Sequence, residues 1–477
     1  MEIIRKYWRR LVAVVGVLVL IGAGTGLLVW YKFFRVVEQP AFASEEEFFK
    51  YGSVRSELLL GLPYPLFVTL PRVFPDLLPG PGGFASFGLP WEEGKPLPVG
   101  LSLKTLGFPR VTLNCAFCHT TSYRERPEDL PTYVVGGPTH TLRLQKLFRF
   151  LFAAANDPRF TSTRLMIEMS MDFDMSLLDR ALYYFFIIPF TREAIQQAEK
   201  QFAWIDTRPD WGPGRDDPFN LVKFILNQQP DDDTSGNTDI PAVWRLDDRD
   251  GQALHWSGEA LTPNAVVTLS AVGIASLPFK DFEARNARIE AFLRKLQPPA
   301  YPFGVDDTLA QRGATLFAEN CADCHASGGS RVGSVIPLDE IGTDPGRSDS
   351  FTKNDAERAN RRFRLLGVDD SEFTAASGYV ARPLSGVWLL GPYLHNGSVP
   401  HLRALLTPPD QRPRSFYRGY DVYDQKNVGF VSDDAAAAAG AWRYDTDVRG
   451  NSNAGHVFGT TLPADDKTAL IEYLKTL

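Results

Sequence analysis

The four cysteines of this 477-residue chain occur in two copies of one arrangement. The sequence is CAFCH at residues 115–119 and CADCH at residues 321–325, so each cysteine pair is followed directly by a histidine. C-x-x-C-H is the attachment signature of c-type haem, in which two thiols form thioethers to one porphyrin and the histidine reaches its iron. A redox dithiol or a zinc half-site does not require this histidine. The spacing therefore predicts two covalently bound haem c groups, held by Cys115, Cys118, His119, Cys321, Cys324 and His325.

The residue on the opposite face of each iron decides whether a haem transfers electrons or binds a reactant. All five methionines lie at or before residue 175, so a methionine ligand for the second haem is not expected. Three histidines follow the second motif: His395, His401 and His456. We predict that His456 closes the second haem, because it lies in the Gly/Asn-rich loop GNSNAGHVFG, whose backbone can approach a porphyrin closely. His395 and His401 are the alternatives.

Helical patterns flank the second motif and would position it. The segment TLAQRGATLFAEN leads directly into CADCH, and DDKTALIEYLKTL is an amphipathic helix with Asp465 and Asp466 in its first turn. A small cytochrome c domain needs such helices to enclose its haem. Pro298 and Pro299 end the preceding helical pattern, DFEARNARIEAFLRKL, so we place a domain boundary there.

We therefore expect a mainly α-helical fold made of two tandem cytochrome c-type haem domains with extended, irregular loops. The N-terminal haem domain would cover residues 36–299 and be catalytic, and the C-terminal domain would cover residues 300–477 and transfer electrons. Residues 36–110 are dense in proline and glycine, which excludes long helices and predicts an irregular wrap. The aromatic-dense stretch at 177–190, LLDRALYYFFIIPF, is too short to span a membrane and is expected to be a core helix or an apolar, substrate-facing surface.

Residues 11–31 carry no charged side chain and are long enough to cross a bilayer. The basic residues before this stretch outnumber those just behind it, so the N-terminal end should stay in the cytoplasm. We expect residues 1–35 to form a cytoplasmic stub and a single-pass anchor in a bacterial inner membrane, with the body in the periplasm. A cleaved signal peptide is the alternative, and it would also export the body.

The overall charge does not favour a nucleic-acid partner. The formal net charge is −7, from 50 basic and 57 acidic residues. Nucleic-acid binding would favour a basic face, which this composition does not suggest. We therefore expect a solvated, mildly acidic surface.

Several further segments carry a resemblance to a known family. They are WGPGRDDPFN, DIPAVW followed by LHWSG, ARPLSGVWLLGPYLHNGSVP and GHVFGT. With the two C-x-x-C-H motifs, they make the chain beyond residue 40 resemble the bacterial di-haem cytochrome c peroxidase superfamily and, within it, the di-haem rubber oxygenases and their uncharacterised relatives. The resemblance implies that Trp256 lies between the two haems and assists electron transfer. It also implies that calcium is a further cofactor in the related peroxidases, and the sequence does not decide whether calcium belongs here.

The segment behind Trp256 separates peroxide chemistry from dioxygen chemistry. Breaking the O–O bond of hydrogen peroxide requires an acid/base, which the peroxidases carry as a glutamate downstream of their tryptophan. Here residues 260–276 contain no charged residue, and Glu259 comes too early to match. An apolar distal face suits dioxygen and an apolar substrate. The rubber-oxygenase resemblance implies the same arrangement, with an open first haem and a second haem closed by His325 and His456.

We therefore predict a haem-dependent oxidoreductase that uses dioxygen to oxidise or cleave an apolar, unsaturated substrate, with a redox protein as a further partner. The residues assigned to catalysis are His119, Trp244, His255 and Trp256. Those assigned to cofactor contacts beyond the motifs are Arg215, Arg382, Tyr393 and His395. One alternative is a di-haem peroxidase that takes its acid from Glu259 or from the acidic loop at 228–239. The other is a non-enzymatic electron-transfer cytochrome c with two six-coordinate haems.

Overall fold

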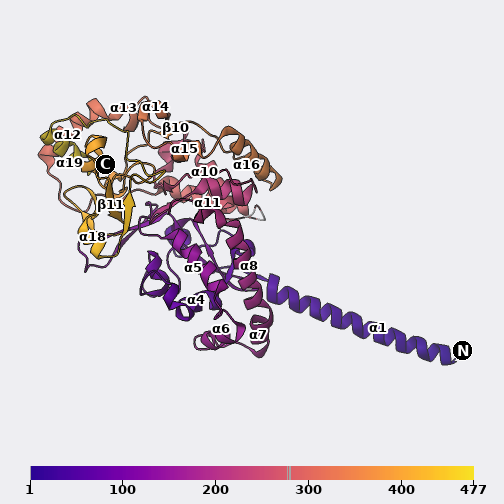
Figure 1. The fold of residues 1–477 in the computed structure, drawn as a ribbon. Helices are drawn as coiled ribbons and strands as arrows, with labels where there is room; N and C mark the ends of the chain where they lie inside the picture. Colours follow the sequence, from indigo (N-terminus) through magenta and orange to yellow (C-terminus); the bar gives the residue numbers. More distant parts are fainter. Residues whose placement is uncertain (1, 277, 279–280) are drawn as a thin grey trace.

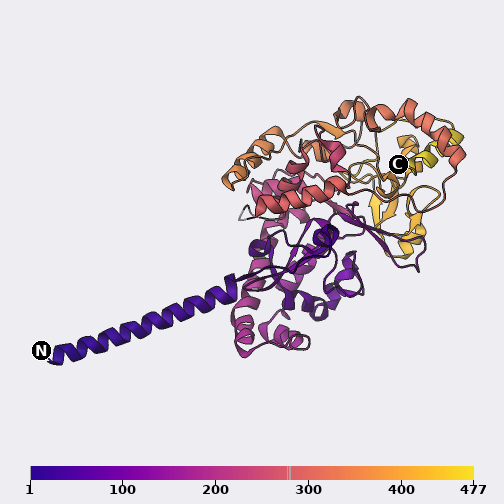
Figure 2. The ribbon, with the colours of Figure 1, turned by 180° about the vertical axis from the view of Figure 1, so that it is seen from behind.

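The computed structural model describes residues 2–276, 278 and 281–477. Helix α1 (Glu2–Val29) continues into a π-helical turn, η1 (Trp30–Phe34), and the two project from the body as one long rod (Figures 1 and 2). Within the described residues, this is the one helix long and apolar enough to cross a membrane. A signal sequence has the same properties. The predicted apolar N-terminal segment is thus confirmed as a helix, and its retention stays a prediction.

A four-stranded antiparallel sheet begins the body. Its order is β1 (Val36–Val37), β3 (Leu101–Leu106), β4 (Phe108–Leu113) and β2 (Leu62–Pro63). The prediction of an irregular wrap over residues 36–110 is therefore wrong for this sheet. Its proline-bearing strand β2 lies at an edge, where a missing amide hydrogen is tolerated. The helices of the same region are short, as expected: α2 (Glu45–Tyr51), α3 (Glu57–Leu60) and α4 (Tyr64–Val73).

A helical layer follows the sheet and encloses an aromatic core. Its segments are α5 (Leu144–Asn156), α6 (Ser162–Met169), α7 (Leu177–Leu182), η5 (Tyr183–Ile187) and α8 (Ile188–Gln201). Phe84 and Phe150 have ring centroids 6.0 Å apart in an edge-to-face arrangement, which aromatic pairs prefer. Around these rings, a cluster of buried side chains joins the layer to α4. This core supports the first C-x-x-C-H motif.

The middle of the chain forms a helical pair beside that motif. Helix α10 (Pro263–Gly273) packs against α11 (Phe282–Lys295). The side chain of Thr262 accepts a hydrogen bond from the Ala265 amide and so caps α10. Val267 of α10 lies in one hydrophobic cluster with Ala116, and Cys115 packs against that cluster. The apolar stretch behind Trp256 therefore lies beside the first motif.

The two helices that we expected around the second motif form and pack closely. They are α12 (Asp307–Asn320) and α19 (Ala464–Leu474), which lie at the end of the body remote from α1 (Figure 1). A Cβ atom at Gly313 would lie 2.0 Å from the Ala469 carbonyl oxygen, so the contact requires glycine there. Between them the chain adds α13 (Ala322–His325), α14 (Leu338–Ile341), α15 (Gly346–Asp349), α16 (Lys353–Leu365), α17 (Leu402–Leu405) and α18 (Asp434–Ala438).

The other strands described form two-stranded antiparallel pairs. These are β5 (Thr120–Tyr123) with β6 (Thr132–Val135), β7 (Arg215–Asp216) with β8 (Thr238–Asp239), β9 (Val335–Pro337) with β10 (Gly378–Val380), β11 (Ser415–Arg418) with β14 (Trp442–Asp445), and β12 (Tyr423–Asp424) with β13 (Gly429–Phe430). Ion pairs between Asp239 and Arg418, and between Glu259 and Arg347, cross the boundary predicted at residue 299. The fold is helix-rich, as predicted, and its two parts are tied together by buried charge pairs.

Candidate haem centres

The first C-x-x-C-H motif is held in a short 3-10 helix, η4 (Cys115–Phe117). The Asn114 side chain accepts a hydrogen bond from the Ala116 amide at 3.0 Å and donates to the carbonyls of Lys50 and Gly52 at 3.1 Å each. The residue facing η4 must be glycine, because a Cβ atom at Gly100 would lie 2.1 Å from the Phe117 Cα. The motif is therefore fixed by the sheet region of the N-terminal part.

The imidazole of His119 is oriented by the main chain of a distant segment. Its Nδ1 lies 3.0 Å from the Pro241 carbonyl oxygen, which can only accept a hydrogen bond. Burial lowers the pKa of His119 to about 4, so the ring is neutral at pH 7. A neutral ring that donates from Nδ1 leaves Nε2 as a free acceptor, which is the state a metal-ligating histidine requires.

The histidine of the second motif is also oriented by a main-chain carbonyl, in this case that of Arg382. Cys321 ends α12, and His325 closes the single turn α13. The Nδ1 atom of His325 donates to the Arg382 carbonyl oxygen at 2.6 Å, which fixes this ring as Pro241 fixes that of His119. Burial lowers the pKa of His325 as well.

His456 lies opposite His325. The two ring centroids are 6.2 Å apart, with ring planes inclined by 42°. The loop that carries His456 is fixed by Arg412, which donates to the carbonyls of Gly455 at 2.9 Å and His456 at 3.0 Å. Burial, with a smaller effect of His325, lowers the pKa of His456 to about 4. Its Nδ1 is buried with no hydrogen-bond partner among the described residues.

The spacing of these two rings fits one iron between them. An imidazole nitrogen bonds a transition metal at about 2 Å and lies roughly 1 Å from its ring centroid, so two imidazoles on opposite faces of one metal have centroids roughly 6 Å apart. The observed 6.2 Å agrees with this value. Among the described ring pairs, His119 has no partner placed in this way, although His255 is near enough for its charge to lower the pKa of His119. The residues of the second centre therefore fit a bis-histidine haem.

A short polar route connects the two proximal histidines. The Arg382 guanidinium donates to the Ala242 carbonyl at 3.0 Å, and Ala242 directly follows Pro241, the partner of His119. The carbonyl of the same Arg382 accepts the hydrogen bond of His325. We call this the Arg382 bridge: His119, Pro241, Ala242, Arg382 and His325. One arginine thus contacts the supports of both centres.

Trp256 flanks the Arg382 bridge. The Arg382 guanidinium lies 4.9 Å from the centroid of the Trp256 ring, a cation–π contact. The indole nitrogen of Trp256 donates to the Asp239 carbonyl at 2.7 Å. Burial lowers the pKa of Arg382 to about 9, so the side chain still carries its charge at pH 7.

The other residues predicted for the site are buried in protein contacts. Trp244 donates to the Ser385 carbonyl at 3.0 Å, and Tyr393 donates to the Val387 carbonyl at 3.0 Å. The Arg215 guanidinium donates to the Asn451 side chain at 2.7 Å and to three backbone carbonyls, those of Trp211, Asp210 and Asn396. The His395 ring stacks on Tyr379, with centroids 3.8 Å apart. Their roles toward a cofactor stay predictions.

Glu259 is not a free acid. Its carboxylate forms a buried ion pair with Arg347 at 3.1 Å and accepts a hydrogen bond from the Ser257 hydroxyl. Arg347 also lies 4.4 Å from the Phe219 ring centroid. Neighbouring His255 has a backbone φ of 61°, and burial lowers its pKa to about 4. The acid proposed for the peroxidase alternative is thus paired with a buried cation.

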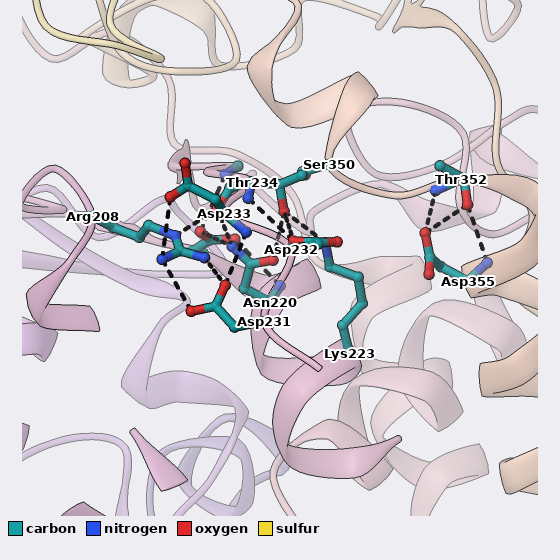
Figure 3. Close-up of polar contacts among 12 residues, drawn as sticks. Arg208, Asn220, Lys223, Asp231, Asp232, Asp233, Thr234, Ser350, Thr352 and Asp355 are labelled. Atoms are coloured by element: carbon teal, nitrogen blue, oxygen red, sulfur yellow. Dashed lines mark hydrogen bonds and ion pairs between the residues drawn. The ribbon is translucent and has the colours of Figure 1, made fainter. Parts of the chain in front are cut away.

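The acidic loop at 228–239 is also neutralised by its neighbours (Figure 3). The ammonium of Lys223, in the π-helix η7 (Leu221–Leu226), has no exposed surface and lies 2.7 Å from an Asp232 oxygen. Arg208 forms an ion pair with Asp231. Within the described residues, no group of three or more His, Cys, Asp or Glu side chains is arranged to hold a metal ion. The carboxylates of Asp231 and Asp232 are thus paired with basic side chains.

Asp216 is a candidate that the sequence reasoning did not single out, although it lies in the quoted segment WGPGRDDPFN. Burial raises its pKa to about 7, against the opposing effect of Arg347, and the charges of Asp217 and Asp239 add to the rise. Burial raises the pKa of Cys118 too, with a smaller contribution from Asp216, so the carboxyl group lies near the first motif. The adjacent acidic pair was the available signal, but only the fold shows that Asp217 is buried and Asp216 is partly buried.

Comparison with known proteins identifies the kind of domain that carries Arg382. Residues 378–417, which contain Arg382, Tyr393 and His395, match a family described as RoxA-like, cytochrome c-like. The chain thus contains a cytochrome c-like domain, which implies covalently bound haem c and links it to the rubber oxygenase-like proteins.

Two curated relatives come from Sinorhizobium fredii. Over 319 residues, the chain is 31% identical to the uncharacterized protein y4iM. This match covers 57% of this chain and 72% of the relative. It is 34% identical over 254 residues to the uncharacterized protein y4iJ, which covers 38% of this chain and 41% of that relative. The match to y4iJ thus spans less than half of that protein. The chain belongs to the same family as y4iM.

Proposed function

We propose that this chain is a membrane-anchored, exported di-haem c oxidoreductase that uses dioxygen to oxidise or cleave an apolar, unsaturated substrate. The two C-x-x-C-H motifs and the RoxA-like cytochrome match support the class. The observation that carries the proposal is the difference between the two centres. His325 has an opposed imidazole at 6.2 Å, whereas His119 has no such partner among the described ring pairs.

Haem iron with an open position supplies redox chemistry with dioxygen or peroxide, and iron closed by two histidines exchanges electrons. The residues of the chain would hold and tune these groups. Cys115 and Cys118 would attach the first haem, with His119 held in its ligating tautomer by Pro241. Cys321 and Cys324 would attach the second haem between His325 and His456. The Arg382 bridge would keep the proximal histidines in fixed relation.

The walls of the first centre support an apolar reactant. Helix α10 brings Val267 into the cluster that contacts Cys115, and Glu259 is held by Arg347. Neither feature supplies an unpaired acid/base group. An apolar pocket with few polar groups is what an unsaturated, water-insoluble substrate would need.

Asp216 favours a second candidate function, the reduction of hydrogen peroxide. A general acid/base works best when its pKa lies near the operating pH, and burial raises the pKa of Asp216 to about 7. Turnover of hydrogen peroxide with a reduced cytochrome donor, lost on Asp216→Asn substitution, would favour this candidate.

The test is the optical and EPR spectrum of the purified protein as isolated, then after dithionite and carbon monoxide. We expect one low-spin haem that does not bind carbon monoxide and one haem that does. Two low-spin haems without carbon monoxide binding would reject the oxygenase and support an electron carrier. Recovery of the chain in carbonate-washed membranes, with residues 11–31 intact, tests the anchor separately.

A further inference from the structure

Exposed apolar side chains gather on the helical layer that adjoins the membrane-helix candidate. Leu177 is 85% exposed, Phe185 65% and Phe190 62%. Leu178, Tyr184 and Phe186 are exposed as well. The rings of Tyr184 and Phe185 have centroids 4.9 Å apart, and those of Phe186 and Phe190 lie 6.3 Å apart, so the four rings form two exposed pairs along one helical stretch. We call the exposed side of this stretch the 177–190 face.

The same segment has a second, buried side. Tyr183, Ile187 and Ile188 belong to the aromatic core of the N-terminal part. The buried side of this stretch agrees with the predicted core helix, and its other side faces outward. Soluble proteins seldom expose a contiguous apolar surface of this kind unless it has a partner.

An ion pair and a series of aromatic rings tie the stretch at 177–190 to the end of the apolar rod. The Lys32 ammonium of η1 pairs with an Asp179 oxygen at 2.6 Å. The Phe33 and Phe108 rings have centroids 6.3 Å apart, and Phe108 and Tyr183 follow at 6.1 Å. A Cβ atom at Gly107 would lie 2.3 Å from the Phe33 Cα, so the rod end also touches the turn between β3 and β4 along the backbone. In both views α7 and α8 lie where the rod leaves the body (Figures 1 and 2).

We propose that the 177–190 face lies in the interfacial layer of the bilayer that α1 crosses. This inference rests on the proposed membrane anchor. The rod fixes the face within contact distance of its own end, so any bilayer that contains residues 11–31 must come close to it. The rod also ends in Trp30 and Tyr31, and aromatic residues of this kind prefer the membrane–water interface. Burying the exposed rings in lipid removes apolar surface from water.

The test uses the full chain in nanodiscs of phosphatidylethanolamine and phosphatidylglycerol that contain a phospholipid with a diazirine in its acyl chain. After illumination, peptide mapping by mass spectrometry locates the labelled residues. We expect label in residues 177–190 as well as in 11–31. The triple variant Phe185→Ser, Phe186→Ser, Phe190→Ser should reduce labelling of 177–190 by about tenfold, because three rings no longer partition into lipid.

Leu130→Ser with Leu365→Ser is the matched control, since these side chains are 91% and 81% exposed at other places. Labelling of 177–190 should not change in this control, and the haem spectra of all variants should match that of the unaltered chain. Unlabelled 177–190 in the unaltered chain overturns the proposal. A dimer that forms in detergent from the unaltered chain but not from the triple variant also overturns the proposal, because a second copy of the chain would then cover the face.

Different results would reject the proposed membrane anchor and the proposed placement of the 177–190 face. A mature chain whose N-terminus lies beyond residue 35 rejects the anchor. In a chain that keeps its N-terminus, label in residues 11–31 without label in 177–190 leaves the anchor intact and overturns the placement of the face.

Discussion

The two C-x-x-C-H motifs share a signature and differ in what surrounds them. The first is enclosed by the sheet region and α10, and its histidine has no opposed imidazole among the described ring pairs. The second follows α12, and its histidine faces His456 at 6.2 Å. Both histidines donate to a main-chain carbonyl, so the difference lies on the far face. The motif thus predicts attachment, whereas the imidazole opposed to His325 comes from a loop more than a hundred residues away.

The largest expected effect comes from opening the second centre. His456→Ala should convert the second haem from low-spin to high-spin and raise carbon monoxide bound per chain from about one to about two, because an axial ligand is lost. Optical titration after dithionite measures this. His401→Ala is the control, since that ring caps α17 by accepting from the Ala404 amide at 3.0 Å. An unchanged spectrum for His456→Ala would reject the assigned ligand.

Removing the Arg382 side chain should shift the reduction potentials of the two haems by different amounts. Arg382→Ala removes a partly buried positive charge that contacts the supports of both centres, and it should lower the reduction potential of the first haem by roughly 60 mV, the equivalent of about 1.4 kcal/mol. The guanidinium lies close to the supports of His119, while His325 keeps its carbonyl partner, so the second potential should move less. Redox titration followed optically gives both values. Arg382→Lys keeps the charge and should recover most of the shift; equal shifts in both variants would contradict the electrostatic cause.

Substitution of Glu259 tests whether the first haem centre uses this carboxylate as its acid/base. Glu259→Gln should lower the free energy of unfolding by about 3 kcal/mol, because Arg347 is left as an unpaired buried charge. Denaturant melts measure the loss, and Glu259→Gln with Arg347→Gln should recover part of it. Loss of peroxide turnover without loss of stability would instead identify Glu259 as the acid.

The smaller of the two effects on stability concerns Asp216 and depends on pH. Its pKa is raised from 3.8 to about 7 in the folded chain, so the folded state binds the extra proton between these values. The stability contributed by this group is therefore present below pH 4 and is lost as pH rises toward 7. Asp216→Asn should leave stability unchanged at pH 4 and raise it at pH 8 by on the order of 2 kcal/mol. Thermal melts at the two pH values measure this, and equal effects at both would contradict the raised pKa.

The sequence predicted the parts of each centre that are local. The C-x-x-C-H spacing, the helices α12 and α19, and the apolar segment α10 all depend on neighbours in the chain. The four-stranded sheet was missed, because its first strand pairs with one more than sixty residues away. The Glu259–Arg347 pair and the Arg382 bridge were missed for the same reason, since each joins residues about ninety or more positions apart.

The Arg382 bridge has a consequence for how this chain can diverge from its relatives. Its acceptors at Pro241, Ala242 and Arg382 are main-chain oxygens, which every amino acid possesses. Substitution at positions 241 and 242 can therefore change the side chain and leave the connection intact. Only its donors depend on residue identity: the imidazoles of His119 and His325 and the guanidinium of Arg382. We expect related sequences to vary freely at positions 241 and 242, and an exchange at any of the three donors to require compensation nearby.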